Sequence, residues 1–79
     1  MMTTYGQRIR ALRTAAQVPQ VLLAERIGLR KPELCQREKN VKPMSKAEYL
    51  RAAAALLEIR SERDAAFEQA WKNITGDAA

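Results

Sequence analysis

Residues 17–38, QVPQVLLAERIGLRKPELCQRE, contain two short segments of helical periodicity on either side of Gly28. The apolar residues of the first segment recur at helical spacing and are Leu22, Leu23 and Ile27. The second segment has one strongly apolar residue, Leu34, among basic and amide side chains. Two short helices joined by a tight glycine-containing turn predict a helix-turn-helix, whose second helix can enter the major groove of DNA.

The boundaries of three helices follow from capping and breaking residues. Thr4 stands three residues before Gln7, a capping-box spacing that predicts the start of a first helix. The apolar face of this helix comprises Tyr5, Ile9, Leu12 and Ala16. Pro19 suits the first position of a second helix, whose buried side we expect to comprise Leu22, Leu23, Ala24 and Ile27. Gly28 should end that helix in the left-handed conformation.

A third helix should begin at Lys31 or Pro32, because proline is tolerated only in the first turn. Leu34 is expected to face inward, and Asn40 is suited to a left-handed helix end. Val41–Met44 then form a loop, and Ser45 with Glu48 forms a second capping box. A fourth helix therefore starts near Ser45.

The chain from residue 45 to residue 74 contains no proline or glycine, which favours one long helix. A coiled-coil-like seam with one charged member follows steps of three and four through Ala52, Leu56, Ile59, Arg63, Ala66, Ala70 and Ile74. A parallel apolar row comprises Tyr49, Ala53, Leu57, Phe67 and Trp71. The first half of this helix should cover the helix-turn-helix core, and the second should bury Phe67 and Trp71. Ser61–Asp64 could instead cap a separate last helix after a break near Arg60.

The charge of the chain is unevenly distributed. Residues 1–46 contain ten lysines and arginines against three acids, a net charge of +7, whereas residues 47–79 contain four against six, a net −2. The basic excess coincides with the helix-turn-helix stretch, which indicates a polyanion contact there and a different task for the C-terminal half. The alternative is a generally basic surface that serves solubility.

These patterns predict an all-α fold, a compact four-helix helix-turn-helix domain with an extended or additional C-terminal helix. We expect this domain to span residues 1–57, a dimerisation helix to span 58–76, and residues 77–79 to be a frayed tail. A 79-residue chain is only marginally stable alone, so dimerisation would help it. The expected dimer interface comprises Ile59, Ala66, Phe67, Ala70, Trp71 and Ile74.

Several function classes are poorly supported by the composition. The chain has no histidine, and its only serines, Ser45 and Ser61, both read as helix caps, so we expect neither enzymatic activity nor a metal or cofactor site. The single cysteine, Cys35, fits a reducing cytoplasm and is read as an incidental small residue, with a DNA-facing thiol as the alternative. No apolar run could span a membrane, and MMTTYGQRIR lacks the apolar region of a signal peptide. We therefore expect a cytoplasmic, nucleoid-associated protein without a membrane partner.

Residues 13–38 follow the pattern R-x-x-x-x-V-P-Q-x-x-L-A-x-x-I-G-L-x-x-x-x-L-x-x-x-E. This pattern resembles the phage repressor and Cro-like (XRE-type) helix-turn-helix family over about residues 5–57. The positions that match are Arg13, Gln20, Leu23, Ala24, Ile27, Gly28, Leu29, Leu34 and Glu38. Departures from the family pattern are Pro19 and Arg30 in place of polar caps, Pro32 at a base-reading position, Arg37 at an apolar one, and Lys39-Asn40 in place of Asn-Gly.

The resemblance assigns roles to individual residues. It implies an ion pair of Arg13 with Glu38 that ties the first helix to the end of the third. It places base contacts at Lys31, Pro32 and Gln36, where lysine suits guanine, glutamine suits adenine and proline offers only apolar contact. It implies phosphate contacts at Gln20, Lys39, Lys42 and Lys46. Arg30 and Arg37, which depart from the family pattern, are also expected to contact phosphates.

The resemblance and the charge pattern together predict a transcriptional regulator, a repressor, that binds an inverted repeat in double-stranded DNA as a homodimer. The alternative is an antitoxin or adaptor that binds a protein partner through the helix of Phe67 and Trp71, with or without control of its own operon.

Overall fold

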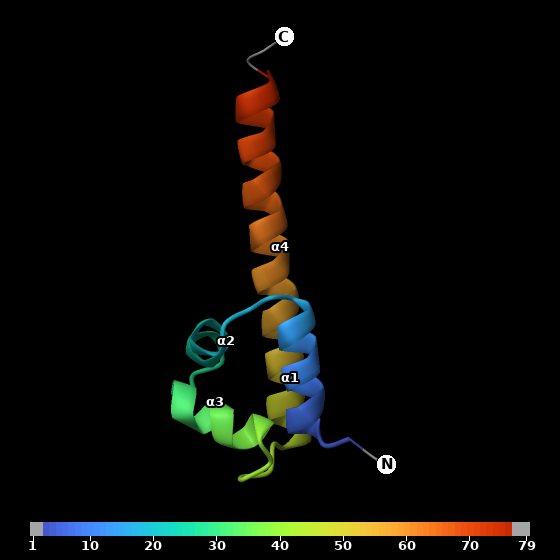
Figure 1. The fold of residues 1–79 in the computed structure, drawn as a ribbon, viewed down its shortest axis with the longest axis vertical. Coiled ribbons are helices and arrows are strands. Elements are labelled where there is room, and N and C mark those ends of the chain that lie inside the picture. The colour runs from blue at the N-terminus through green and yellow to red at the C-terminus, as the bar shows by residue number, and fades with distance from the viewer. Residues whose placement is uncertain (1–2, 77–79) are drawn as a thin grey trace.

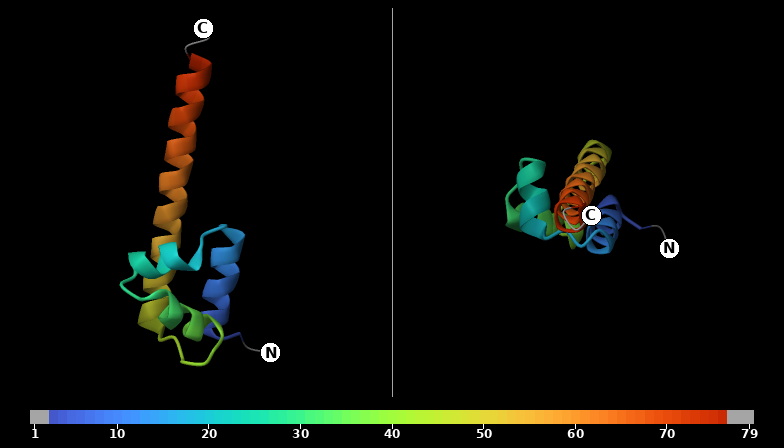
Figure 2. Two further views of the ribbon diagram at one scale, coloured as in Figure 1. Left: turned by 60° about the vertical axis from the view of Figure 1, so that its left-hand side comes forward. Right: turned by 90° about the horizontal axis from the view of Figure 1, so that it is seen from above.

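The computed structural model of the chain describes residues 3–76, which form four helices and no strand. The helices are α1 (Tyr5–Ala15), α2 (Gln20–Arg26), α3 (Lys31–Glu38) and α4 (Lys46–Gly76). α4 runs the length of the molecule, and α1, α2 and α3 are gathered around its first half (Figures 1 and 2). The predicted fold class, all-α with four helices of which the last is long, is confirmed.

The ends of the helices follow local capping chemistry. The backbone N–H of Gln7 donates to the Thr4 hydroxyl at 3.2 Å, and the Thr4 N–H donates to the Gln7 side chain at 3.0 Å. Ser45 and Glu48 make the same reciprocal pair before α4. Gly28 and Asn40 have φ angles of 77° and 62°, as expected for left-handed helix ends.

The connection between α1 and α2 differs from expectation in two respects. Pro19 is the N-cap rather than the first helical residue, so α2 begins at Gln20. Gln17 has a φ of 57°, a conformation that non-glycine residues seldom adopt, and the sequence pattern did not point to it. The Val18 side chain between them is buried, which explains why the chain turns inward here.

The core lies where α1, α2 and α3 meet the first half of α4. Its buried apolar residues are Ile9, Val18, Leu23, Ala24, Ile27, Leu34, Met44, Ala52, Ala55, Leu56 and Ile59. Two expected core residues are wrong, because Leu12 is 45% exposed and Leu22 is 37% exposed. Each lies at the edge of a short helix that is covered on one side only, so the neighbouring helices do not reach it.

α1 and α3 approach each other closely at Gly6. A Cβ atom on this residue would lie 1.9 Å from the carbonyl oxygen of Arg37 in α3. Real Cβ contacts are never that short, so the two helices can pack at this distance only because position 6 carries no side chain. The sequence analysis assigned no role to Gly6.

α4 is one continuous helix, so the break near Arg60 that was considered does not occur. Its first half packs on the core, whereas residues 60–74 are all exposed and extend beyond the other helices (Figure 1). Ile59 belongs to the core, so the expected domain boundary at residue 57 is too early. Residues 77–79, expected to fray, lie outside the described residues. No helix within residues 3–76 combines the length and apolarity required to cross a membrane.

Candidate nucleic-acid interface

A buried polar network fixes α3 against α1 and α2. Arg13 in α1 makes a two-pronged ion pair with Glu38 at the end of α3, with Nε–Oε2 2.7 Å and Nη2–Oε1 2.9 Å. The third guanidinium nitrogen, Nη1, donates to the Val18 carbonyl at 2.9 Å. The Glu38 side chain is 1% exposed, so the ion pair expected from the resemblance is present and shielded from water. Such bidentate pairs fix orientation as well as distance.

Gln20, assigned to a phosphate contact, takes part in this network. Its side-chain Nε2 donates to Glu38 Oε1 at 3.0 Å, so its amide points toward the end of α3 rather than away from the domain. The first residue of α2 is thereby joined to the last residue of α3. The assignment followed position in the motif, and the motif did not indicate that a buried carboxylate would need a second donor.

The predicted base-reading residues lie on α3 as expected from their spacing. Lys31 and Pro32 are exposed in the first turn, and Gln36 is half-buried one turn later. Cys35 lies four residues after Lys31 and four before Lys39, so these residues share one helix face. Pro32 and Gln36 are likewise four residues apart, so the three base-reading candidates lie on two adjacent rows of α3.

Four of the expected phosphate contacts, Arg30, Lys39, Lys42 and Lys46, are exposed. Arg30 precedes α3, and the three lysines follow it through the loop into α4. These positive charges therefore flank both ends of α3.

Arg37 is the exception among the expected phosphate contacts. Its Nε donates to Glu48 Oε2 at 2.9 Å and its Nη1 donates to the Glu33 carbonyl at 3.1 Å. The side chain is only 17% exposed, so it joins α3 to α4 instead of reaching outward. The pKa of Glu48 is lowered, first by the hydrogen bond from the Ser45 backbone and then by the charge of Arg37.

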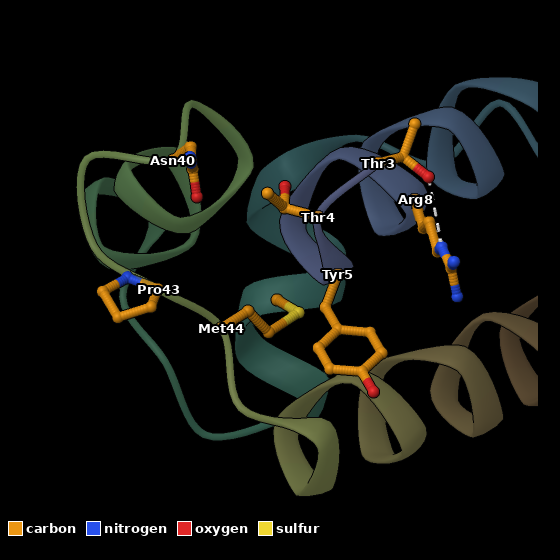
Figure 3. Close-up of a pocket in the computed structure, with 7 residues that line it drawn as sticks. All are labelled: Thr3, Thr4, Tyr5, Arg8, Asn40, Pro43 and Met44. Carbon is orange, nitrogen blue, oxygen red and sulfur yellow. Dashed lines mark hydrogen bonds between the residues drawn. The ribbon is translucent and has the colours of Figure 1, made fainter. Parts of the chain in front are cut away.

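The loop after α3 lies against the start of α1, where the two segments line a pocket of about 510 Å³. Figure 3 shows Met44 and the Tyr5 ring near its centre, with Asn40 and Arg8 on opposite sides. Tyr5 stacks on Tyr49 of α4 with ring centroids 4.9 Å apart, and Arg8 donates to the Thr3 hydroxyl at 3.2 Å. The ring contact joins α1 to α4, and the hydrogen bond joins α1 to the residues that precede it.

Two polar contacts that the sequence analysis missed tie the middle of α4 to the domain. Arg26 of α2 donates to both carboxylate oxygens of Glu62, at 3.1 and 2.8 Å, and the pKa of Glu62 is lowered by this hydrogen bond and by the arginine charge. Arg63 donates to the Ala16 carbonyl and, at 3.1 Å, to the Gln17 carbonyl at the end of α1. The charged member of the predicted seam therefore caps α1.

The expected dimer residues divide into two groups. Ile59 is 2% exposed within its own chain, so its assignment to a dimer interface is wrong. Its place in the heptad-like seam did not reveal that α1–α3 already cover that face. The remaining five are exposed on α4 and comprise Ala66, Phe67, Ala70, Trp71 and Ile74.

Comparisons with protein-family models, with characterised protein sequences and with solved structures found no match to this chain.

Proposed function

We propose that this chain is a sequence-specific DNA-binding transcriptional regulator, a repressor similar to the phage repressor and Cro-like (XRE-type) family. It would bind an inverted repeat as a homodimer with α3 in the major groove, and would be associated with the nucleoid. The observation that carries the proposal is the outer edge of α3, which carries Lys31 and Pro32 exposed in its first turn, Gln36 half-buried one turn later and Lys39 exposed at its C-cap.

The side chains on this edge match the chemistry of base edges. A lysine ammonium donates to guanine O6 and N7, and a glutamine amide can both donate to and accept from adenine. Pro32 has no donor and can contribute only apolar contact, for example with a thymine methyl group. Because Lys31 and Gln36 are more than one turn apart, they would address different base pairs.

The rest of the domain supplies a fixed orientation for α3 and positive charges for phosphate contacts. The Arg13–Glu38–Gln20 network holds α3 at a fixed angle, which limits the ordering required on binding. Arg30, Lys39, Lys42 and Lys46 are available for phosphates on both sides of α3. Affinity for any DNA should therefore fall steeply as the salt concentration rises.

Anisotropy titrations of a labelled DNA duplex test the proposal. Lys31→Ala and Gln36→Ala should each weaken binding to a preferred site by about 1–3 kcal/mol and relax the base preference at one position. Lys39→Ala should weaken binding to all sequences alike. Lys72→Ala, which removes an equal charge near the far end of α4, is the matched control and should change little. If the α3 variants behave like the control, α3 does not read DNA.

Cys35 provides a second test that needs no substitution, because it is the only thiol in the chain and lies on the same face as Lys31 and Lys39. Bound duplex should slow its alkylation by a maleimide, and salt that dissociates the duplex should restore the rate. Equal rates with and without bound duplex would place the DNA elsewhere.

The exposed side chains of α4 favour a second candidate, an antitoxin or adaptor-type interaction module. Phe67 and Trp71 are 71% and 60% exposed, a large apolar surface for so small a chain. Under this candidate, Phe67→Ala and Trp71→Ala abolish binding of a partner protein, whereas Lys31→Ala and Gln36→Ala leave it unchanged. Pull-down of the same partner with the four variants separates the two functions.

A further inference from the structure

α4 carries a second seam beside the residues that pack into the core, and most of this seam is exposed. Six residues follow each other at steps of four and three, which keeps them on one side of the helix: Ala53, Leu57, Arg60, Asp64, Phe67 and Trp71. We call these six residues the α4 seam. Ala53 is half-buried and the other five are exposed. This seam is displaced around the helix from the buried residues Ala52, Ala55, Leu56 and Ile59.

We propose that the α4 seam is the interface with a second copy of this chain. The two α4 helices would run antiparallel, and the two-fold axis between them would lie level with position 62. In this register Arg60 faces Asp64 of the other copy, because both lie two residues from position 62. Leu57 faces Phe67, five residues from it, and Ala53 faces Trp71, nine residues from it. A two-fold interface repeats each of these pairs.

Charge complementarity supports both a second copy of the chain as the partner and the antiparallel arrangement of the two α4 helices. Reciprocal Arg60–Asp64 pairs place opposite charges at the centre of the interface. A parallel pairing would instead set Arg60 against Arg60 and Asp64 against Asp64, and like charges at close range are costly. Neither side chain has an ion-pair partner among residues 3–74 of its own chain, so both remain available.

Size complementarity points the same way. Beside Ala53 the side chains of α1 and α4 surround a cavity of about 290 Å³, lined by Leu12, Ala15 and Leu57 among others. In the antiparallel register Trp71 of the other copy faces Ala53, so its indole ring would lie at this cavity. The smallest side chain of the seam is thus matched with the largest. The same contact would cover Leu12, which is 45% exposed within a single chain.

The register also sets the separation of the two α3 helices, and this step rests on the proposed function. α3 lies level with Glu48–Arg51 of α4, because Arg37 pairs with Glu48 and the turn before α3 meets Arg51. Twelve residues from position 62 to position 50 span about 18 Å at the helical rise, so the two α3 helices lie about 36 Å apart along α4. Successive major grooves on one side of DNA are about 34–36 Å apart.

Sedimentation equilibrium without DNA tests the interface independently of any DNA binding. The unaltered chain should form a dimer, and Arg60→Asp or Asp64→Arg alone should raise its dissociation constant at least about tenfold, because like charges then meet. The double substitution Arg60→Asp/Asp64→Arg restores opposite charges and should return the dissociation constant to within about threefold of the starting value. Even weak interfaces still associate at about 100 micromolar. An unaltered chain that remains monomeric at about this concentration would therefore overturn the inference.

Crosslinking checks the direction. In a Cys35→Ser background, Leu57→Cys combined with Phe67→Cys should give a covalent dimer with a short bis-maleimide, whereas Phe67→Cys alone should not. A covalent dimer from Phe67→Cys alone would show a parallel pairing and contradict the register. Circular dichroism of each variant verifies that the four helices are intact. A dimer insensitive to both the charge reversals and the crosslinking positions would show that the copies meet through another surface.

Discussion

The two halves of α4 differ in which side chains they bury and which they expose. The first half buries small residues, Ala52 and Ala55, along with Leu56 and Ile59. The second half carries the largest apolar side chains of the helix, and Phe67 and Trp71 are mostly exposed. Small side chains allow α1–α3 to approach the first half closely, whereas large exposed ones suit contact with a separate molecule. Residues within one helix can thus serve two different interfaces.

Gly6→Ala should cause the largest loss of stability, because it adds an atom where α1 and α3 approach each other closely. Its Cβ would lie 1.9 Å from the Arg37 carbonyl oxygen, and neither backbone can move without separating α1 from α3. We expect a loss of more than about 4 kcal/mol in the free energy of unfolding, measured by urea titration. Gly28→Ala is the control, since nothing lies within 4 Å of its Cβ and only its positive φ opposes the change. It should cost about 1 kcal/mol, and equal costs at the two glycines would contradict the packing described.

Glu38→Gln should come next. It leaves the Arg13 guanidinium without its carboxylate in a site where that carboxylate is 1% exposed. We expect a loss of about 3 kcal/mol, the lower end for a broken buried pair, because Arg13 keeps its bond to the Val18 carbonyl. Glu68→Gln removes the exposed partner of Lys72 in the second half of α4 and should change the free energy of unfolding by less than about 0.5 kcal/mol. A Glu38→Gln protein as stable as the Glu68→Gln protein would refute the structural role of the network.

Arg63→Ala should have an intermediate effect on the free energy of unfolding. It tests how far along α4 the contacts with the α1–α3 domain extend. It removes two hydrogen bonds to carbonyls that follow α1, at Ala16 and Gln17. Because the site is exposed, the expected loss is about 1 kcal/mol of unfolding free energy. Lys72→Ala, nine residues further along α4, should cost almost nothing. Amide hydrogen exchange should show faster exchange at the end of α1 only for the first variant.

The smallest predicted effect is the dependence of stability on pH at Glu48. Its pKa in the folded chain is lowered by the Ser45 N–H and by Arg37, so it stabilises the fold above the ordinary glutamate pKa. That contribution is lost as the pH falls through the lowered pKa. Urea titrations should cover about four pH units around carboxylate titration, from pH 7 to pH 3. Over this range the free energy of unfolding should decline less steeply for Glu48→Gln than for the unaltered chain. Parallel curves would mean that Glu48 titrates alike in the folded and unfolded chains.

Much of the fold could be predicted because it depends on local chemistry. The capping boxes at Thr4 and Ser45, the left-handed Gly28 and Asn40, and the start of α3 at Lys31 all follow from a few neighbouring residues. The continuity of α4 was favoured for the same reason.

The features that were wrong or missed depend on contacts between distant segments. The hydrogen bonds of Gln20 with Glu38 and of Arg37 with Glu48 were missed, because spacing along the chain does not identify these partners. Gly6 gave no signal, since a close approach of two helices is a property of the packed pair. Ile59 and Phe67 occupy similar helical patterns, and only the position of α1–α3 shows that one is buried and the other exposed.

Selection of bound sequences from a random pool of double-stranded DNA tests most directly the claim that the α1–α3 domain reads DNA while the second half of α4 joins two copies. The account predicts enrichment of an inverted repeat whose half-site centres are about 10–10.5 base pairs apart. Lys31→Ala and Gln36→Ala should change which bases are enriched, and Lys72→Ala should not. A pool that shows no enrichment after repeated rounds, at a salt concentration where the protein still binds DNA, would contradict it.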